Sequence, residues 1–358
     1  MDWNKAIAYG QLVNAAYDVV AGEAPATGGY EVVATIYAND LATDASRQRG
    51  QPVATVAIGL ILQAQASGDV VIAIRGTEGI KEWVQDAKFL MRQFTPVAGA
   101  GETEDGFTDV YRSMKVGEGA EAATVVKWLG EHQWRRPTTS LTICGHSLGG
   151  ALATLLALDV AANAEVAFQN PIVYTYASPR TGDEQFIAKY NQLVATTNRL
   201  VDNADLVPQL PSDPPYKHVG EAIEMDSFTL IPPRIRLQPN PVCWHIMSSY
   251  LYLMSLELGG PPIPPKPECT PGDVVPGLLE QLKEKLRSTD KLADEFTTRA
   301  RSLHPGQTGG AARRPHRRDG CLRHLRGVRA APPVHRGVDE LVCATVPLAV
   351  LGGRSRRD

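Results

Sequence analysis

The sequence has few cysteines and no pair of them at metal-binding or redox spacing. The five cysteines are scattered through 358 residues, and no Cys-x-x-Cys motif occurs. They lie at Cys144, Cys243, Cys269, Cys321 and Cys343. This distribution indicates neither a zinc site nor a dense disulfide framework. Cys144 follows an apolar run, so we expect a small buried core residue there.

The chain also lacks a strong charge excess, a targeting pattern and a membrane span. Its formal net charge of −3 predicts no nucleic-acid partner. Residues 1–5 do not begin a basic and then apolar leader, so we expect no secretory signal, and secreted and cytoplasmic locations both stay open. The longest uncharged stretch, residues 137–158, contains three glycines. A strand, a turn and a helix explain it better than one membrane helix.

Charge is distributed very unevenly along the chain. Residues 301–358 contain 12 arginines, no lysine and four acidic residues, whereas the preceding 300 residues contain 24 basic and 35 acidic residues. This tail has no Ile, Phe, Tyr, Trp or Met, so it has little to bury and is predicted to be mostly disordered. It is either a basic arm for an anionic surface or a stretch read out of frame or left by cloning. The absence of lysine favours the second explanation.

Composition divides the chain into four regions. Residues 1–258 are predicted to form one α/β domain, and residues 259–272 form a proline-rich, extended linker. Residues 273–302 carry leucines at helical spacing, which predicts one amphipathic helix that packs on the core or mediates self-association. Residues 303–358 form the arginine-rich tail.

Residues 1–258 alternate between helical and strand patterns. Strands are expected at 32–37, 53–62, 70–74, 141–144, 172–176 and 197–201. Helices are expected at 5–20, 80–94, 117–133, 151–158 and 183–195. This alternation predicts an α/β fold with a mostly parallel central sheet and helices on both faces.

The run Gly-His-Ser-Leu-Gly-Gly at 145–150 carries the strongest chemical signal. It contains Gly-x-Ser-x-Gly centred on Ser147, with a strand-like run before it and a helix-like run after it. That context indicates a nucleophile elbow rather than a chance turn. The strained turn excludes a side chain two residues on either side of the serine, and Gly145 and Gly149 meet that requirement.

A serine nucleophile needs a base, and the base needs an acid that orients it. In a fold with this elbow the chain order is serine, acid, histidine. Between the elbow and the tail, His218 and His245 follow the serine, and the residues alone leave both open. The loop 200–208 offers Asp202 and Asp205. Asp205 lies farther inside the loop and Asp202 suits a turn, so spacing favours Asp205.

Ester chemistry also needs donors for a developing oxyanion. The backbone N–H of Leu148 is one candidate. Thr77, after the strand 70–74 and a glycine, offers an N–H and a hydroxyl, although it also suits the cap of a following helix. The apolar segment 80–94 fits two descriptions equally, a helix that lies on a lipid interface and an ordinary core helix.

The order of these motifs resembles the class 3 (fungal-type) lipases. The resemblance covers residues 1–258 and rests on blocks in the same order. They are Ile-Arg-Gly-Thr at 74–77, the elbow, Tyr-Ala-Ser-Pro-Arg-Thr-Gly-Asp at 176–183, Asp-Leu-Val-Pro at 205–208, Tyr-Lys-His-Val-Gly at 216–220, and the late histidine with its helix at 245–250.

The resemblance implies an α/β-hydrolase fold without metal or cofactor. It implies a triad of Ser147, Asp205 and His245 with Thr77 and Leu148 as the oxyanion hole. It also implies that the His-Val-Gly histidine lies near the acid without being the base, and that segment 80–94 is a lid.

The expected activity is a triacylglycerol lipase that acts on a lipid substrate through an acyl-enzyme. The alternatives are a phospholipase or an aryl or feruloyl-type esterase, and, from another class, a silent hydrolase fold used for binding. Two departures from the family pattern bear on substrate fit. Residues 104–107 read Glu-Asp-Gly-Phe where the family often has His-x-Gly-Phe, and Ala177 replaces a glycine.

Overall fold

The computed structural model describes residues 1–40, 54–77, 89–117, 119–137, 140–164, 168–227, 241–264 and 269. The chain divides into two units, 1–305 and 306–358, and every described residue belongs to the first. The helix expected at 273–302, the tail, half of the linker and most of segment 80–94 therefore lie outside the described residues.

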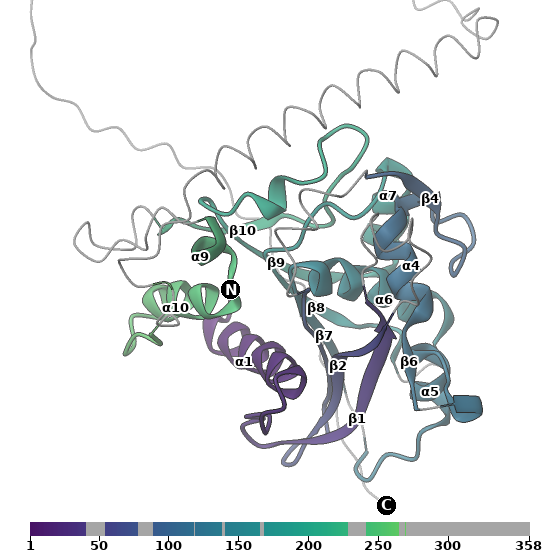
Figure 1. Cartoon of the computed structure of the whole chain (residues 1–358), viewed down its shortest axis with the longest axis horizontal. Helices are drawn as coiled ribbons and strands as arrows, with labels where there is room; N and C mark the ends of the chain where they lie inside the picture. The colour runs from purple at the N-terminus through teal and green to yellow at the C-terminus, as the bar shows by residue number, and fades with distance from the viewer. Residues whose placement is uncertain are drawn as a thin grey trace, which may run out of the picture. The chain divides into compact units, whose positions relative to one another are not determined.

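Among the described residues, eight strands form one sheet (Figure 1). Their order is β10-β9-β8-β7-β3-β2-β1-β6, and the five strands from β10 to β3 are parallel, whereas β2, β1 and β6 join antiparallel. Their bounds are β1 Tyr30–Asn39, β2 Thr55–Ala64, β3 Val70–Ile74, β6 Lys115–Val116, β7 Leu141–His146, β8 Ile172–Tyr176, β9 Thr196–Asp202 and β10 Ala222–Met225. The mostly parallel sheet follows the expectation, with an antiparallel edge that sequence patterns did not predict.

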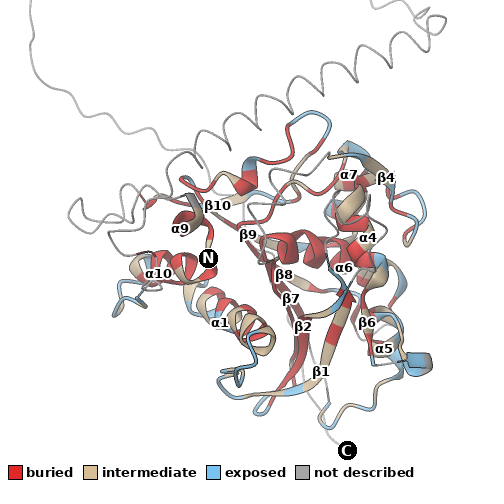
Figure 2. Cartoon of the chain, viewed as in Figure 1, coloured by how far each residue is buried: buried red, intermediate tan, exposed pale blue. Residues whose placement is uncertain are grey.

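Helices cover both faces of this sheet because its strands are apolar on both sides (Figure 2). On β3, Ile72 and Ile74 join the core beneath α6, whereas Val71 and Ala73 join the core beneath α1. Successive side chains of a strand point to opposite faces, so one strand contributes to both cores. The helices are α1 Trp3–Val20, α4 Asp105–Ser113, α5 Val125–Glu131, α6 Leu148–Asn163, α7 Glu184–Leu193, α9 Pro241–His245 and α10 Met247–Leu258.

The helices α1 and α10 pack side by side on one face (Figure 1). A Cβ built on Gly10 would lie 2.7 Å from the Met247 side chain, so the glycine permits the close approach. The α1 helix begins where the Asp2 carboxylate accepts a hydrogen bond from the Lys5 N–H. Gly259 caps the carboxyl end of α10, and its φ of 71° suits a residue without a side chain.

Two expected helices differ in the structure. Residues 91–93 of the expected helix 80–94 form strand β4 (Met91–Gln93), which pairs with β5 (Glu102–Glu104). A glycine-containing turn joins them, and Gly101 at φ 83° packs where a Cβ would lie 2.5 Å from Asp183 Oδ1. Tertiary contacts therefore override the apolar pattern here. The expected helix 117–133 is shorter, with a 3-10 turn at Gly119–Glu121 followed by α5.

The cysteines give one result that the sequence did not predict. Cys243 and Cys269 form a disulfide and tie α9 to the segment that follows α10. Their separation of 26 residues matches no local motif, so spacing alone did not pair them. Cys144 is fully buried, as expected, and burial raises the pKa of its thiol.

Candidate active site

Ser147 lies on a sharp turn between β7 and α6. Its φ of 57° is a conformation that residues with a side chain rarely adopt. A Cβ on Gly145 would lie 2.1 Å from the Gly149 carbonyl oxygen, and one on Gly149 would lie 2.3 Å from the Ile74 carbonyl oxygen. Both glycines are therefore sterically required, and the local structure is the elbow that the sequence predicts.

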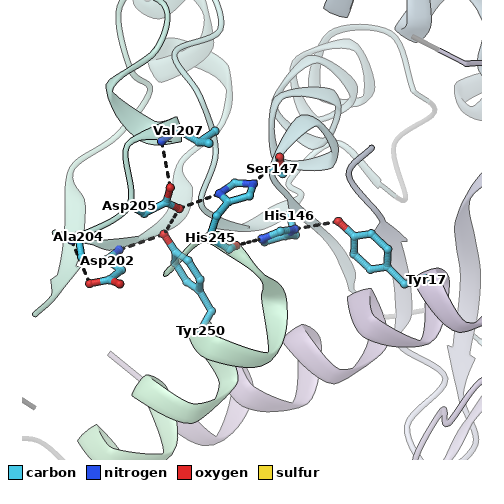
Figure 3. Close-up of polar contacts among 9 residues, drawn as sticks. All are labelled: Tyr17, His146, Ser147, Asp202, Ala204, Asp205, Val207, His245 and Tyr250. Atoms are coloured by element: carbon cyan, nitrogen blue, oxygen red, sulfur yellow. Dashed lines mark hydrogen bonds and ion pairs between the residues drawn. The ribbon is translucent and has the colours of Figure 1, made fainter. Parts of the chain in front are cut away.

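The side chains of Ser147, His245 and Asp205 form a continuous hydrogen-bonded chain (Figure 3). His245 Nε2 lies 2.8 Å from Ser147 Oγ, and His245 Nδ1 lies 2.8 Å from Asp205 Oδ2. The other carboxylate oxygen accepts from the Val207 N–H at 3.0 Å. Because an ionised carboxylate only accepts, Nδ1 carries the proton and Nε2 presents its lone pair to the serine hydroxyl.

These three side chains come from separate parts of the fold and meet in a buried place. Ser147 follows β7, Asp205 follows β9, and His245 ends the short helix α9. Their exposed fractions are 1%, 2% and 4%. Burial strengthens electrostatic interactions among them because little water screens the charges.

Asp202 and His218, the alternatives that residue types left open, lie elsewhere. Asp202 Oδ1 accepts from the N–H groups of Ala204 and Ser227, both at 3.2 Å, and burial raises its pKa to about 6. His218 Nε2 donates to the Pro208 carbonyl at 2.7 Å, and burial and nearby arginines lower its pKa to about 3. Asp202 therefore closes a turn, and His218 contacts the loop that carries Asp205.

Comparison with known proteins agrees with this architecture. Residues 71–214 match the family model described as lipase (class 3). Residues 71–214 are therefore similar to this family, over less than half of the chain. The matched region contains Ser147 and Asp205 and ends before His245.

Two proteins similar to this chain are a phospholipase and a lipase. The phospholipase A1-II 6 of Oryza sativa subsp. japonica is 32% identical over 219 residues, which are 54% of this chain and 52% of that protein. A lipase of Rhizomucor miehei is 31% identical over 167 residues, which are 45% of this chain and 43% of that protein. The chain thus spans about half the length of these relatives.

Solved structures support the fold. A deletion mutant of the Rhizomucor miehei lipase in complex with its propeptide aligns with a TM-score of 0.50 at 24% identity. The alignment covers 64% of this chain and 68% of that chain. The predicted α/β-hydrolase fold is confirmed.

Asp205 has a further contact that the sequence patterns did not predict. The Tyr250 hydroxyl donates to Asp205 Oδ2 at 2.9 Å and accepts from the Asp202 N–H at 3.0 Å (Figure 3). Tyr250 is fully buried on α10. No local motif marks such a tyrosine, because its partner lies 45 residues away in the chain.

His146, the residue before Ser147, contacts two other segments with its ring. Its Nδ1 lies 2.8 Å from the Tyr17 hydroxyl, and its Nε2 lies 2.6 Å from the His245 carbonyl oxygen. The Tyr17 hydroxyl also accepts from the Gly76 N–H at 2.8 Å. His146 therefore links α1 to the main chain of His245.

The two candidate oxyanion donors lie beside the elbow. Leu148 is the first residue of α6, where N–H groups lack helical partners and favour negative charge. Thr77 follows Gly76, and a Cβ on Gly76 would lie 2.8 Å from Ser147 Cβ. The chain enters this loop at Arg75, whose guanidinium donates to the carbonyls of Ala57 and Gly76. Residues 78–88 lie outside the described part, so the helix-cap alternative for Thr77 does too.

The described residues contain neither a metal-site cluster nor a membrane-spanning helix. No group of three or more His, Cys, Asp or Glu side chains in the described part has the arrangement of a metal site. None of the described helices has both the length and the apolar character to cross a membrane.

Proposed function

We propose that this protein is a serine hydrolase that cleaves carboxylic esters of lipids through Ser147, Asp205 and His245. One observation carries the proposal: an elbow serine lies 2.8 Å from a histidine whose other nitrogen lies 2.8 Å from a buried aspartate. A base within hydrogen-bond reach of the nucleophile and an acid that orients the base are what acyl transfer needs.

In the proposed mechanism, His245 Nε2 takes the proton of Ser147 as the serine oxygen attacks the ester carbonyl. The N–H of Leu148, with the N–H and hydroxyl of Thr77, stabilises the negative charge on the carbonyl oxygen. Asp205 stabilises the imidazolium. The leaving alcohol takes the proton from His245, and water then attacks the acyl-enzyme with the same histidine as base.

Acylglycerols are the proposed substrates, with phospholipids as the second candidate. The fungal relative is a lipase and the rice relative is a phospholipase A1, at similar identity. Rates on emulsified tributyrin, triolein and phosphatidylcholine separate the candidates. A higher rate on phosphatidylcholine would reassign the protein to phospholipases. A preference for tributyrin without interfacial activation would make it an esterase.

The activity is tested with p-nitrophenyl butyrate and a fluorophosphonate probe. We expect the wild type to hydrolyse the ester and to be labelled, and Ser147→Ala to do neither. Ser67→Ala is the matched control, because Ser67 lies in an exposed turn and contacts Asp69. His245→Ala should be as damaging as Ser147→Ala, and His218→Ala milder. A folded wild type that is never labelled would instead support the silent binding module.

A further inference from the structure

Three segments far apart in the sequence meet at the side chain of His146 (Figure 3). Tyr17 comes from α1, His146 from the last position of β7, and His245 from the last position of α9. The rings of His146 and His245 lie 4.9 Å apart between centroids. His146 is 3% exposed, so water has little access to these contacts.

The direction of each hydrogen bond follows from which groups can donate. The His245 carbonyl only accepts, so His146 Nε2 carries a proton. Burial and the neighbouring His245 lower the pKa of His146 well below its usual value, so the ring is neutral and has one proton. Its Nδ1 therefore accepts from the Tyr17 hydroxyl, which itself accepts from the Gly76 N–H.

The two ends of this chain of hydrogen bonds, Gly76 and the His245 carbonyl, adjoin the proposed catalytic machinery. The α9 helix has five residues and ends at His245, where carbonyls have no partner within the helix. His146 supplies that partner. At the other end, Gly76 precedes Thr77, and a Cβ on Gly76 would lie 2.7 Å from the Tyr17 hydroxyl. The hydroxyl is thus packed against the main chain of the oxyanion loop.

We propose that Tyr17 and His146 are positioning residues that hold the oxyanion loop at Gly76 and the main chain of His245 in register with Ser147. The inference rests on the proposed function. Asp205 orients the side chain of the base, and His146 holds its main chain. One directed chain of hydrogen bonds thereby sets the distance between the base and the oxyanion donors.

The expected effect lies in the transition state rather than in ester binding. Tyr17→Phe keeps the ring but removes the acceptor for Gly76 and the donor to His146. Small displacements of catalytic groups have large effects on rate, so we expect kcat to fall about tenfold with KM within about twofold. His146→Leu also releases the His245 carbonyl, and kcat should fall about a hundredfold. His146→Gln keeps a side-chain N–H and should recover part of that loss.

The experiment measures kcat and KM with p-nitrophenyl butyrate. The value of kcat is calculated per serine labelled by the fluorophosphonate, so that misfolded molecules do not lower it. Inhibition by a butylboronic acid, which mimics the tetrahedral state, should weaken in step with kcat. Tyr9→Phe is the matched control. It makes the same change on α1, at a hydroxyl that contacts Thr142 at 3.4 Å.

Each outcome decides the question. The inference is supported if kcat falls for Tyr17→Phe but not for Tyr9→Phe. In the double variant, adding Tyr17→Phe to His146→Leu should then lower kcat little further. If the wild type is active and kcat of Tyr17→Phe lies within twofold of that of Tyr9→Phe, the inference is overturned. It is also overturned if the loss of activity vanishes when the rate is divided by the amount of labelled serine. A wild type that neither hydrolyses nor labels overturns the proposed function, and the inference with it.

Discussion

Ser147 and His245 lie within hydrogen-bond distance of each other, yet the protein holds them by different means. Ser147 is held by its own neighbours, because Gly145 and Gly149 let the main chain fold tightly around the elbow. His245 ends a five-residue helix that is too short to hold it alone. Its place depends on the side chains of His146 and Asp205, on Tyr250, which contacts Asp205, and on a disulfide two residues earlier.

The positions of Ser147 and His245 are therefore fixed by two different kinds of interaction. On the side of the proposed nucleophile, by which we mean residues 145–149, geometry comes from main-chain sterics, and a side chain at Gly145 or Gly149 would clash. On the base side, meaning α9 with the side chains that contact it, geometry comes from several hydrogen bonds. Each such bond contributes on the order of 1 kcal/mol. We expect graded losses of activity there, except where the charge of Asp205, the proposed stabiliser of the imidazolium, is removed.

The largest loss of activity is expected from Asp205→Asn, which removes the negative charge beside His245. Loss of the equivalent acid from a serine-histidine-acid triad lowers kcat by about 10⁴-fold. We expect a loss of that order in p-nitrophenyl butyrate hydrolysis. Asp202→Asn is the control with the same change three residues earlier, and it should keep activity within about tenfold. If Asp202→Asn were the more damaging, the acid would be assigned to the wrong residue.

Gly145→Ala tests the steric argument on the nucleophile side. The new methyl would lie 2.1 Å from the Gly149 carbonyl oxygen, so the turn must open. We expect kcat/KM to fall by more than about a hundredfold, with a lower melting temperature. Gly260→Ala is the control, because its nearest atom would be 3.8 Å away. An active Gly145→Ala enzyme would show that the elbow is less constrained than its contacts indicate.

Asp202→Asn also tests how burial affects stability. Burial raises the pKa of Asp202 from 3.8 to about 6. The folded protein therefore binds this proton more tightly than the unfolded chain does. Stability falls as the pH rises from about 4 to about 6, by about 3 kcal/mol at most. We expect Asp202→Asn to gain about 2 kcal/mol at pH 8 and little at pH 4 in urea unfolding. An equal gain at both pH values would contradict this linkage.

Tyr250→Phe should give the smallest effect on activity of this set. It removes one donor to Asp205 and leaves the Val207 N–H and His245 in place. We expect kcat to fall about tenfold, in line with the loss of one hydrogen bond to a charged group. The rate of p-nitrophenyl butyrate hydrolysis per labelled serine at pH 8 measures this fall in kcat. A loss as large as that of Asp205→Asn would mean that the base side depends on this one contact.

Sequence patterns predicted some elements well and missed others for physical reasons. The strands β3 and β8 match their expected bounds, because short buried strands read as continuous apolar runs. Strand β4 was expected to be helical. The longer segment 80–94 has the apolar pattern of a helix, but pairing with β5 decides the conformation of residues 91–93. The antiparallel edge and the disulfide depend on contacts between distant segments, which no local pattern records.

The sequence by itself determined the elbow, since a strand, a serine between glycines and a helix are a local steric arrangement that neighbouring residues specify. It narrowed the acid and the base to two candidates each, and family resemblance then favoured Asp205 and His245. Only the tertiary structure decided which side chains face Ser147 and that Tyr17, His146 and Tyr250 hold them. Those contacts join residues 45 to 129 positions apart. Such contacts form when helices pack on a sheet, and the residues of each segment alone do not encode which partner they meet.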